Sequence, residues 1–245
     1  MSSVGMNEIT GRIDFNAAEI ENFITQRGYR VSWEKWAPCP CVREQSFKPD
    51  IACPLCKGYG DVFSDLIETR ALVTSIGAQK EFRDFSEWYV GAASITVSVK
   101  ERTAGYRDRF ILLDCEVVFS ELRKREEDSS TKTYLTYAPV EMRRVFVRAD
   151  DKSGYVELTE GTHYTIANDG AVVWVMPALP AVGQVVSFNY TYRPSYQVIE
   201  LLNDVRLTRT HMVEWESIVL ERLPQKLLTK RSHLMYQLQQ QNTEG

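Results

Sequence analysis

The strongest constraint on the fold is a cluster of four cysteines within residues 39–56. Cys39 and Cys41 are separated by one residue, and Cys53 and Cys56, separated by two, follow eleven residues later. Four thiolates satisfy a tetrahedral Zn²⁺ ion at Zn–S distances of about 2.3 Å, and such a closed site leaves no position for a catalytic water. The spacing therefore predicts one structural zinc ion per chain, bound by Cys39, Cys41, Cys53 and Cys56.

Two alternatives to zinc remain open at the level of sequence. Cys53 and Cys56 could form a redox dithiol, but such a pair normally opens a helix in a βαβ unit, and here Pro54-Leu55 leads into a glycine-rich stretch instead. All four cysteines could also be free thiols. The fifth cysteine, Cys115, lies in the apolar run ILLDCEVVF, which predicts a buried strand residue and not a further ligand.

Composition and charge narrow the class of protein. Hydrophobic residues make up 44% of the 245 residues and charged residues 25%, as expected for a globular chain. The net charge of -4 argues against a protein whose main task is to coat nucleic acid. We find no apolar stretch of about 20 residues and no signal peptide, so we expect no membrane association and a reducing compartment in which disulfides rarely persist.

The pattern of apolar residues predicts a mainly β protein, with a β-barrel or sandwich in one or more domains. Residues 1–65 are expected to hold a short helix over 14–27, ended by Gly28, and then a loop-like zinc-knuckle region from Tyr29 to Asp65. Residues 66–196 are rich in alternating β-branched and aromatic residues and predict the β domain or domains. A charged loop near 123–133 is expected to separate two β layers, with a hinge near it in an elongated molecule.

Two features of the second half guide the strand assignment. Asp169-Gly170 between alternating runs predicts a hairpin, and the run from Gln184 to Glu200 predicts one long strand. Residues 197–245 are expected to form an extended C-terminal interaction segment with a disordered end. Its basic and apolar residues are equally consistent with docking on a partner and with packing on the same domain.

Catalytic signatures are absent from the sequence. We find no phosphate-binding glycine loop, no nucleophile elbow and no metalloprotease motif, and the three histidines lie far apart. The sequence therefore predicts a protein that is not an enzyme.

A resemblance to a known group of proteins adds to these inferences. The block RGYRVSWEKWAPCPCVREQSFKPDIACPLCKGYGDVF resembles the N-terminal part of tailed-bacteriophage virion proteins, through Val31 to Trp33, Cys39, Cys41, and Cys53 to Gly60. The block from Glu157 to Tyr196 is similar to a module of neck and baseplate proteins, and RLPQKLLTKRSHL looks like their closing segment.

The resemblance implies a head-to-tail connector or neck protein that completes the head and forms a homo-oligomeric ring around the DNA channel. Its expected partners are portal, tail or other neck proteins and passing DNA that is not read for sequence. The expected location is the virion, assembled in the host bacterial cytoplasm. A baseplate or tail adaptor is the nearest alternative, and a zinc-containing nucleic-acid-binding protein is an alternative from another class.

Overall fold

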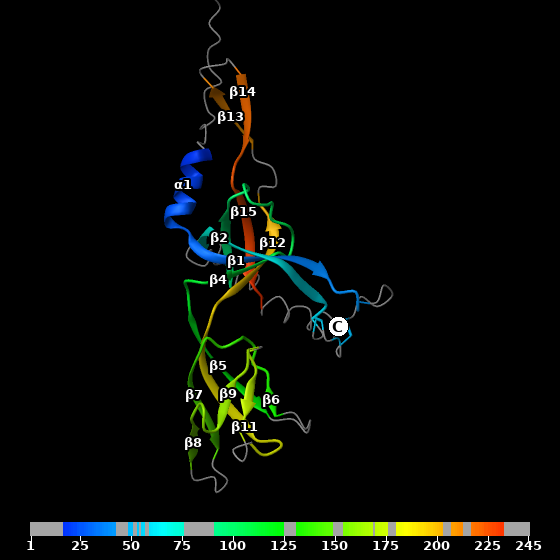
Figure 1. The fold of residues 1–245 in the computed structure, drawn as a ribbon, viewed down its shortest axis with the longest axis vertical. Helices are drawn as coiled ribbons and strands as arrows, with labels where there is room; N and C mark the ends of the chain where they lie inside the picture. Colours follow the sequence, from blue (N-terminus) through cyan, green and yellow to red (C-terminus); the bar gives the residue numbers. More distant parts are fainter. Residues whose placement is uncertain are drawn as a thin grey trace, which may run out of the picture.

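The computed structural model describes residues 17–42, 49–50, 53, 55–56, 59–75, 91–124, 131–148, 154–168, 170–175, 180–202, 207–212 and 217–232. Within them the protein is mainly β, with one short helix near the N-terminus and several sheets (Figure 1). This confirms the predicted fold class. No helix within these ranges has the length and apolar content needed to cross a membrane.

The centre of the molecule is a closed antiparallel barrel of six strands. Around the barrel the order is β1 (Tyr29–Pro38), β2 (Asp61–Ser75), β3 (Ala92–Val97), β15 (Gln225–Arg231), β12 (Ser195–Leu201) and β4 (Arg109–Leu112). Alternate residues of each strand fill the interior, because successive side chains point to opposite faces. Its fully buried residues include Val31, Trp33, Ile95, Phe110 and Leu227.

Strand β1 corrects the expectation that Tyr29 to Asp65 is loop-like. Its Val31 and Trp33 are fully buried in the barrel, and its ladder with β2 runs from Tyr29↔Ala71 to Pro38↔Asp61. The six prolines and glycines of this region all lie beyond Ala37, so the first nine residues are free to form a strand.

A second apolar core lies between two smaller sheets, below the barrel in Figure 1. One sheet has the order β5 (Val117–Lys124), β11 (Val185–Tyr192), β7 (Glu141–Arg148), β8 (Tyr155–Leu158); the other has the order β6 (Lys132–Thr133), β10 (Val172–Trp174), β9 (Tyr164–Ile166). Val145, Phe188 and Tyr190 from the first sheet meet Val172 and Trp174 from the second. Strands β9 and β10 form the hairpin predicted at Asp169-Gly170.

Two segments expected to be single strands are each divided between the barrel and the second core. The run from Arg109 breaks after Leu112 and resumes at Val117, and the run from Gln184 breaks at Arg193-Pro194. Pro194 has no N–H to donate to a ladder, and its carbonyl accepts a hydrogen bond from Leu112 N at 3.0 Å. Cys115 is therefore partly buried between strands and packs against the barrel core, instead of lying inside a strand.

The C-terminal part of the chain contributes to the barrel. Strand β15 pairs with β3 on one side and β12 on the other, so residues 225–231 pack on their own domain. Between β12 and β15 the chain forms a separate two-stranded hairpin, β13 (Leu207–Met212) and β14 (Ser217–Arg222), above the barrel in Figure 1. The boundary expected after residue 196 falls inside β12.

Helix α1 (Ala17–Arg27) lies against β2 and ends where predicted, with Gly28 N donating to Ile24 O at 2.8 Å. Residues 14–16 of the expected helix lie outside the described residues. Its buried residues are Ala17, Glu21 and Ile24. Phe23 is 55% exposed, because the buried stripe is centred on Glu21, whose carboxylate accepts a hydrogen bond from Ser98 at 2.9 Å.

Candidate metal centre

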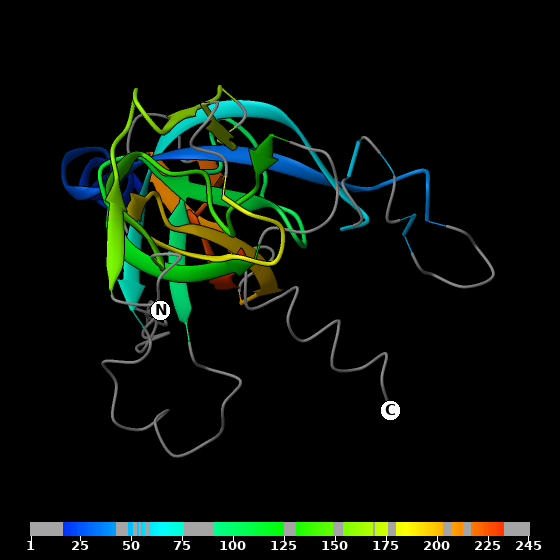
Figure 2. The ribbon, with the colours of Figure 1, turned by 90° about the horizontal axis from the view of Figure 1, so that it is seen from below.

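The four cysteines lie at the tip of the β1–β2 hairpin. The far parts of these two strands extend beyond the barrel as an arm, on the side opposite α1 (Figure 2). Cys39 immediately follows β1, and its N–H continues the ladder by donating to Gly60 O at 2.8 Å. Cys53 and Cys56 lie in the segment that leads into β2, the returning strand of the hairpin. The hairpin ladder therefore brings the two cysteine pairs together.

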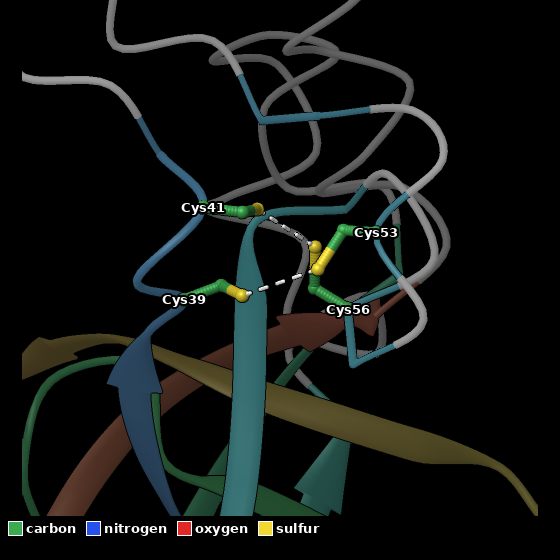
Figure 3. A group of neighbouring side chains, drawn as sticks. All are labelled: Cys39, Cys41, Cys53 and Cys56. Atoms are coloured by element: carbon green, nitrogen blue, oxygen red, sulfur yellow. Dashed lines mark hydrogen bonds between the residues drawn. The ribbon is translucent and has the colours of Figure 1, made fainter.

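The sulfur atoms have the spacing of a metal–thiolate site. All four Sγ atoms lie within 4.8 Å of one another. Cys39 Sγ lies 3.8 Å from Cys53 Sγ, and Cys41 Sγ lies 3.4 Å from Cys56 Sγ (Figure 3). A regular tetrahedron with metal–sulfur distances of about 2.3 Å has sulfur–sulfur edges of about 3.8 Å. The four residues therefore fit one tetrahedral metal ion.

Backbone N–H groups around the cluster point at the sulfurs. The N–H groups of Cys56 and Leu55 donate to Cys53 Sγ, that of Cys41 donates to Cys39 Sγ, and that of Asp50 donates to Cys41 Sγ. Such donors stabilise negative charge on sulfur and orient the ligands of a metal. This arrangement is suited to holding thiolates.

Without a bound cation, the same contacts give the thiols different pKa values. The N–H groups of Cys56 and Leu55 lower the pKa of Cys53 to about 7. The N–H of Asp50 also lowers the pKa of Cys41, but burial and hydrogen bonds from the other three sulfurs outweigh it and raise that pKa to about 12. A bound divalent cation would stabilise all four in the thiolate form, because metal ligation requires deprotonated sulfur.

Three tight turns shape the tip. Val42 N donates to Cys39 O at 3.0 Å, Cys53 N to Asp50 O at 3.1 Å, and Tyr59 N to Cys56 O at 3.0 Å. Gly60 closes the loop with φ +78°, a left-handed conformation that glycine adopts without strain. A Cβ at Gly60 would lie 3.4 Å from both Pro49 and Val42, an ordinary van der Waals contact, so the left-handed backbone and not crowding favours glycine at this position.

A polar cluster along the arm escaped the sequence analysis. Asp61, whose side chain is 3% exposed, accepts hydrogen bonds from Trp36 Nε1 at 2.7 Å and from the Arg107 guanidinium at 3.1 Å. Asp108, also 3% exposed, accepts from Trp33 Nε1 at 3.0 Å and from Lys35 Nζ at 2.7 Å. No motif could have revealed the cluster, because its members come from three segments brought together only by the barrel.

The structure brings together all four predicted ligands and leaves Cys115 outside the group. They are also the only set of three or more His, Cys, Asp and Glu residues in metal-binding proximity within the described ranges. None of the five cysteines is joined to another by a disulfide. The positions of the four sulfurs therefore allow them to bind one metal ion.

No protein-family model matches this chain, and no curated protein matches it either.

Proposed function

We propose that Cys39, Cys41, Cys53 and Cys56 bind one structural zinc ion. The observation that carries this proposal is that their four sulfurs lie within 4.8 Å of one another. The all-sulfur ligand set favours zinc among the common structural metals. With all four positions taken by protein, the ion would fix the tip of the arm and would have no open position for substrate. This supports a structural role and a protein that is not an enzyme.

Native mass spectrometry of the full chain, before and after a strong chelator, tests this proposal. We expect one zinc ion per chain, lost on chelation. Cys41→Ser should lower the zinc content, whereas Cys115→Ser, which replaces the cysteine outside the cluster, should leave it at one per chain. A wild-type chain that binds no zinc in a reducing buffer would contradict the proposal.

We further propose that the protein is a virion component of a tailed bacteriophage, a head-to-tail connector or neck protein that forms a ring around the DNA channel. The resemblance over Arg27 to Phe63 carries this proposal. The architecture is compatible with it: a central barrel bears a cysteine-tipped arm on one side, a hairpin above and a second β unit below (Figure 1). The net charge of -4 would let DNA slide through a lumen without tight phosphate contacts.

The oligomeric state of the purified full chain tests the connector proposal. We expect a closed ring by native mass spectrometry and negative-stain microscopy, because a connector made from one kind of subunit closes by repeated head-to-tail contacts. A chain that remains monomeric at every concentration tested would count against it. Salt-dependent retention on duplex DNA would favour the alternative, a zinc-containing nucleic-acid-binding protein.

A further inference from the structure

The part of the arm nearest the cysteines is fixed by one buried carboxylate, that of Asp61. Asp61 is the first residue of β2 and is paired with Pro38, the last residue of β1. The next residues outward are Gly60 and Cys39, joined by the hydrogen bond from Cys39 N to Gly60 O. Asp61 therefore occupies the last ladder position before the proposed zinc ligands.

The side chain of Asp61 joins three segments of the chain at this position. Its Oδ1 accepts a hydrogen bond from Trp36 Nε1, on the opposite strand of the arm, at 2.7 Å. The same oxygen lies 3.1 Å from the Arg107 guanidinium, in the loop between β3 and β4. The guanidinium also lies over the Trp36 ring, 5.2 Å from its centroid. Asp61 thus ties both strands of the arm to a loop of the barrel.

That loop is itself anchored in the barrel core. Arg107 N donates to Val198 O at 2.9 Å, and Asp108, the next residue, accepts from the indole of fully buried Trp33. Asp108 Oδ1 also accepts from Trp36 N at 3.3 Å. A continuous set of hydrogen bonds therefore runs from the barrel core, through residues 107–108 and Asp61, to the strand ends that carry the cysteines.

We infer that Asp61 is a positioning residue for the metal centre. The inference rests on the proposed zinc site and assigns Asp61 a role in the affinity of that site. By holding Trp36 and Arg107, Asp61 fixes the separation of the two strand ends and so the distance between Cys39 and the Cys53–Cys56 pair. Without the Asp61 carboxylate the strand ends can separate. Zinc binding must then bring the sulfurs back together, which makes the binding free energy less favourable.

The test compares zinc affinity in Asp61→Asn and in the wild-type chain. Groups that hydrogen-bond directly to a metal ligand typically change metal affinity by about 10- to 100-fold when they are replaced, and because Asp61 acts one contact further out, a factor at the lower end, about tenfold, is expected. We expect Asp61→Asn to weaken zinc binding by about that factor, measured by competition with a chromophoric chelator. Trp36→Phe, which keeps a ring but removes the N–H donor, should weaken it in the same direction and provides a second variant if Asp61→Asn fails to fold.

Asp114→Asn is the matched control. Asp114 also ties β1 to a neighbouring segment, through Arg30 N at 2.9 Å and Arg30 Nε at 2.7 Å, but at the end of β1 remote from the cysteines. The zinc affinity of Asp114→Asn should equal that of the wild type. Urea unfolding of the zinc-free proteins separates the two roles, because a purely structural role would lower stability without changing zinc affinity.

The outcomes distinguish this inference from the proposal on which it depends. If the wild-type chain binds no zinc, both the zinc site and the positioning role of Asp61 are contradicted. If the wild type binds zinc and both Asp61→Asn and Trp36→Phe bind it with the same affinity, the positioning role is overturned and the zinc site stands. An equal loss of affinity in Asp114→Asn would also overturn it, because the effect would then reflect general loosening of β1.

Discussion

At the scale of single residues, the arm depends on buried acceptors that each serve several donors. Asp108 accepts from Trp33, Lys35 and Trp36, and also from Gly105 N at 2.9 Å. A buried donor left without an acceptor costs the full desolvation free energy of that group. Trp33 is the critical donor, since it is fully buried in the barrel core.

Replacing Asp108 should therefore destabilise the protein. We expect Asp108→Ala to lower the free energy of unfolding by about 1–3 kcal/mol, because the Trp33 indole N–H loses its buried partner. Urea unfolding with tryptophan fluorescence measures the change. Asp114→Ala, at a more exposed ion pair, should cost clearly less than Asp108→Ala, and equal losses in the two variants would contradict the assignment.

Gly60 provides a second prediction at this scale. A residue with a Cβ at φ +78° costs about 1–2 kcal/mol, and Gly60 has this φ. Gly60→Ala should lower thermal stability and zinc content together. Gly154→Ala is the control, since a Cβ at Gly154 meets nothing within 4 Å. Unchanged zinc content in Gly60→Ala would show that the turn tolerates a side chain.

At the scale of elements, β15 closes the barrel although it is separated from its neighbours by long stretches of chain. It lies between β3 and β12, with Leu227 opposite Ile95 and Leu201. Without β15 the barrel would have two open edges, at β3 and β12, which expose unpaired N–H and C=O groups. The stability of the barrel should therefore depend on apolar contacts made by β15.

A pair of adjacent residues in β15 tests this dependence. Leu227 is fully buried, whereas Lys226 is exposed. Leu227→Ala should lower the free energy of unfolding by about 2–5 kcal/mol, the range for a buried leucine. Lys226→Ala should remain within about 0.5 kcal/mol of wild type. A small effect of Leu227→Ala, measured by denaturant unfolding, would mean that β15 contributes little to the barrel.

At the scale of the whole molecule, two apolar cores share few connections. The barrel core and the core between the smaller sheets contain different residues. Two chain segments cross between them, at residues 113–116 and 193–194, and the junction is packed by Tyr137 stacked on Tyr192 at 3.8 Å. Arg231 at the end of β15 donates to Tyr192 Oη at 3.4 Å. Residues 125–130 of the hinge expected near 123–133 lie outside the described residues, and the flanking strands β5 and β6 both belong to the smaller sheets around the second core.

Substitutions in the two cores should act independently. Leu227→Ala in the barrel and Val145→Ala in the second core share no cluster. Their effects on unfolding free energy should add to within about 0.5 kcal/mol, as for distant sites. The double variant and both single variants, measured in the same denaturant series, provide the test. A larger deviation would show that the cores are energetically coupled through the Tyr137–Tyr192 junction.

The sequence by itself determined the features that depend on local chemistry. The spacing of four cysteines identified a cluster that could bind a metal ion, the alternation of apolar residues identified a mainly β protein, and Asp169-Gly170 identified the β9–β10 hairpin. Each is encoded within a few neighbouring residues, where side-chain type and spacing decide the outcome.

Only the tertiary structure decided which strands share a sheet. Strand β1 joins residues far along the chain in β4, and β15 joins β3, because burial in a common core rewards pairings that no local pattern specifies. The same closure brings Asp61, Trp36 and Arg107 together behind the cysteines. The clustering of the four cysteines was therefore readable from their spacing, whereas the contacts among Asp61, Trp36 and Arg107 depend on the closed barrel.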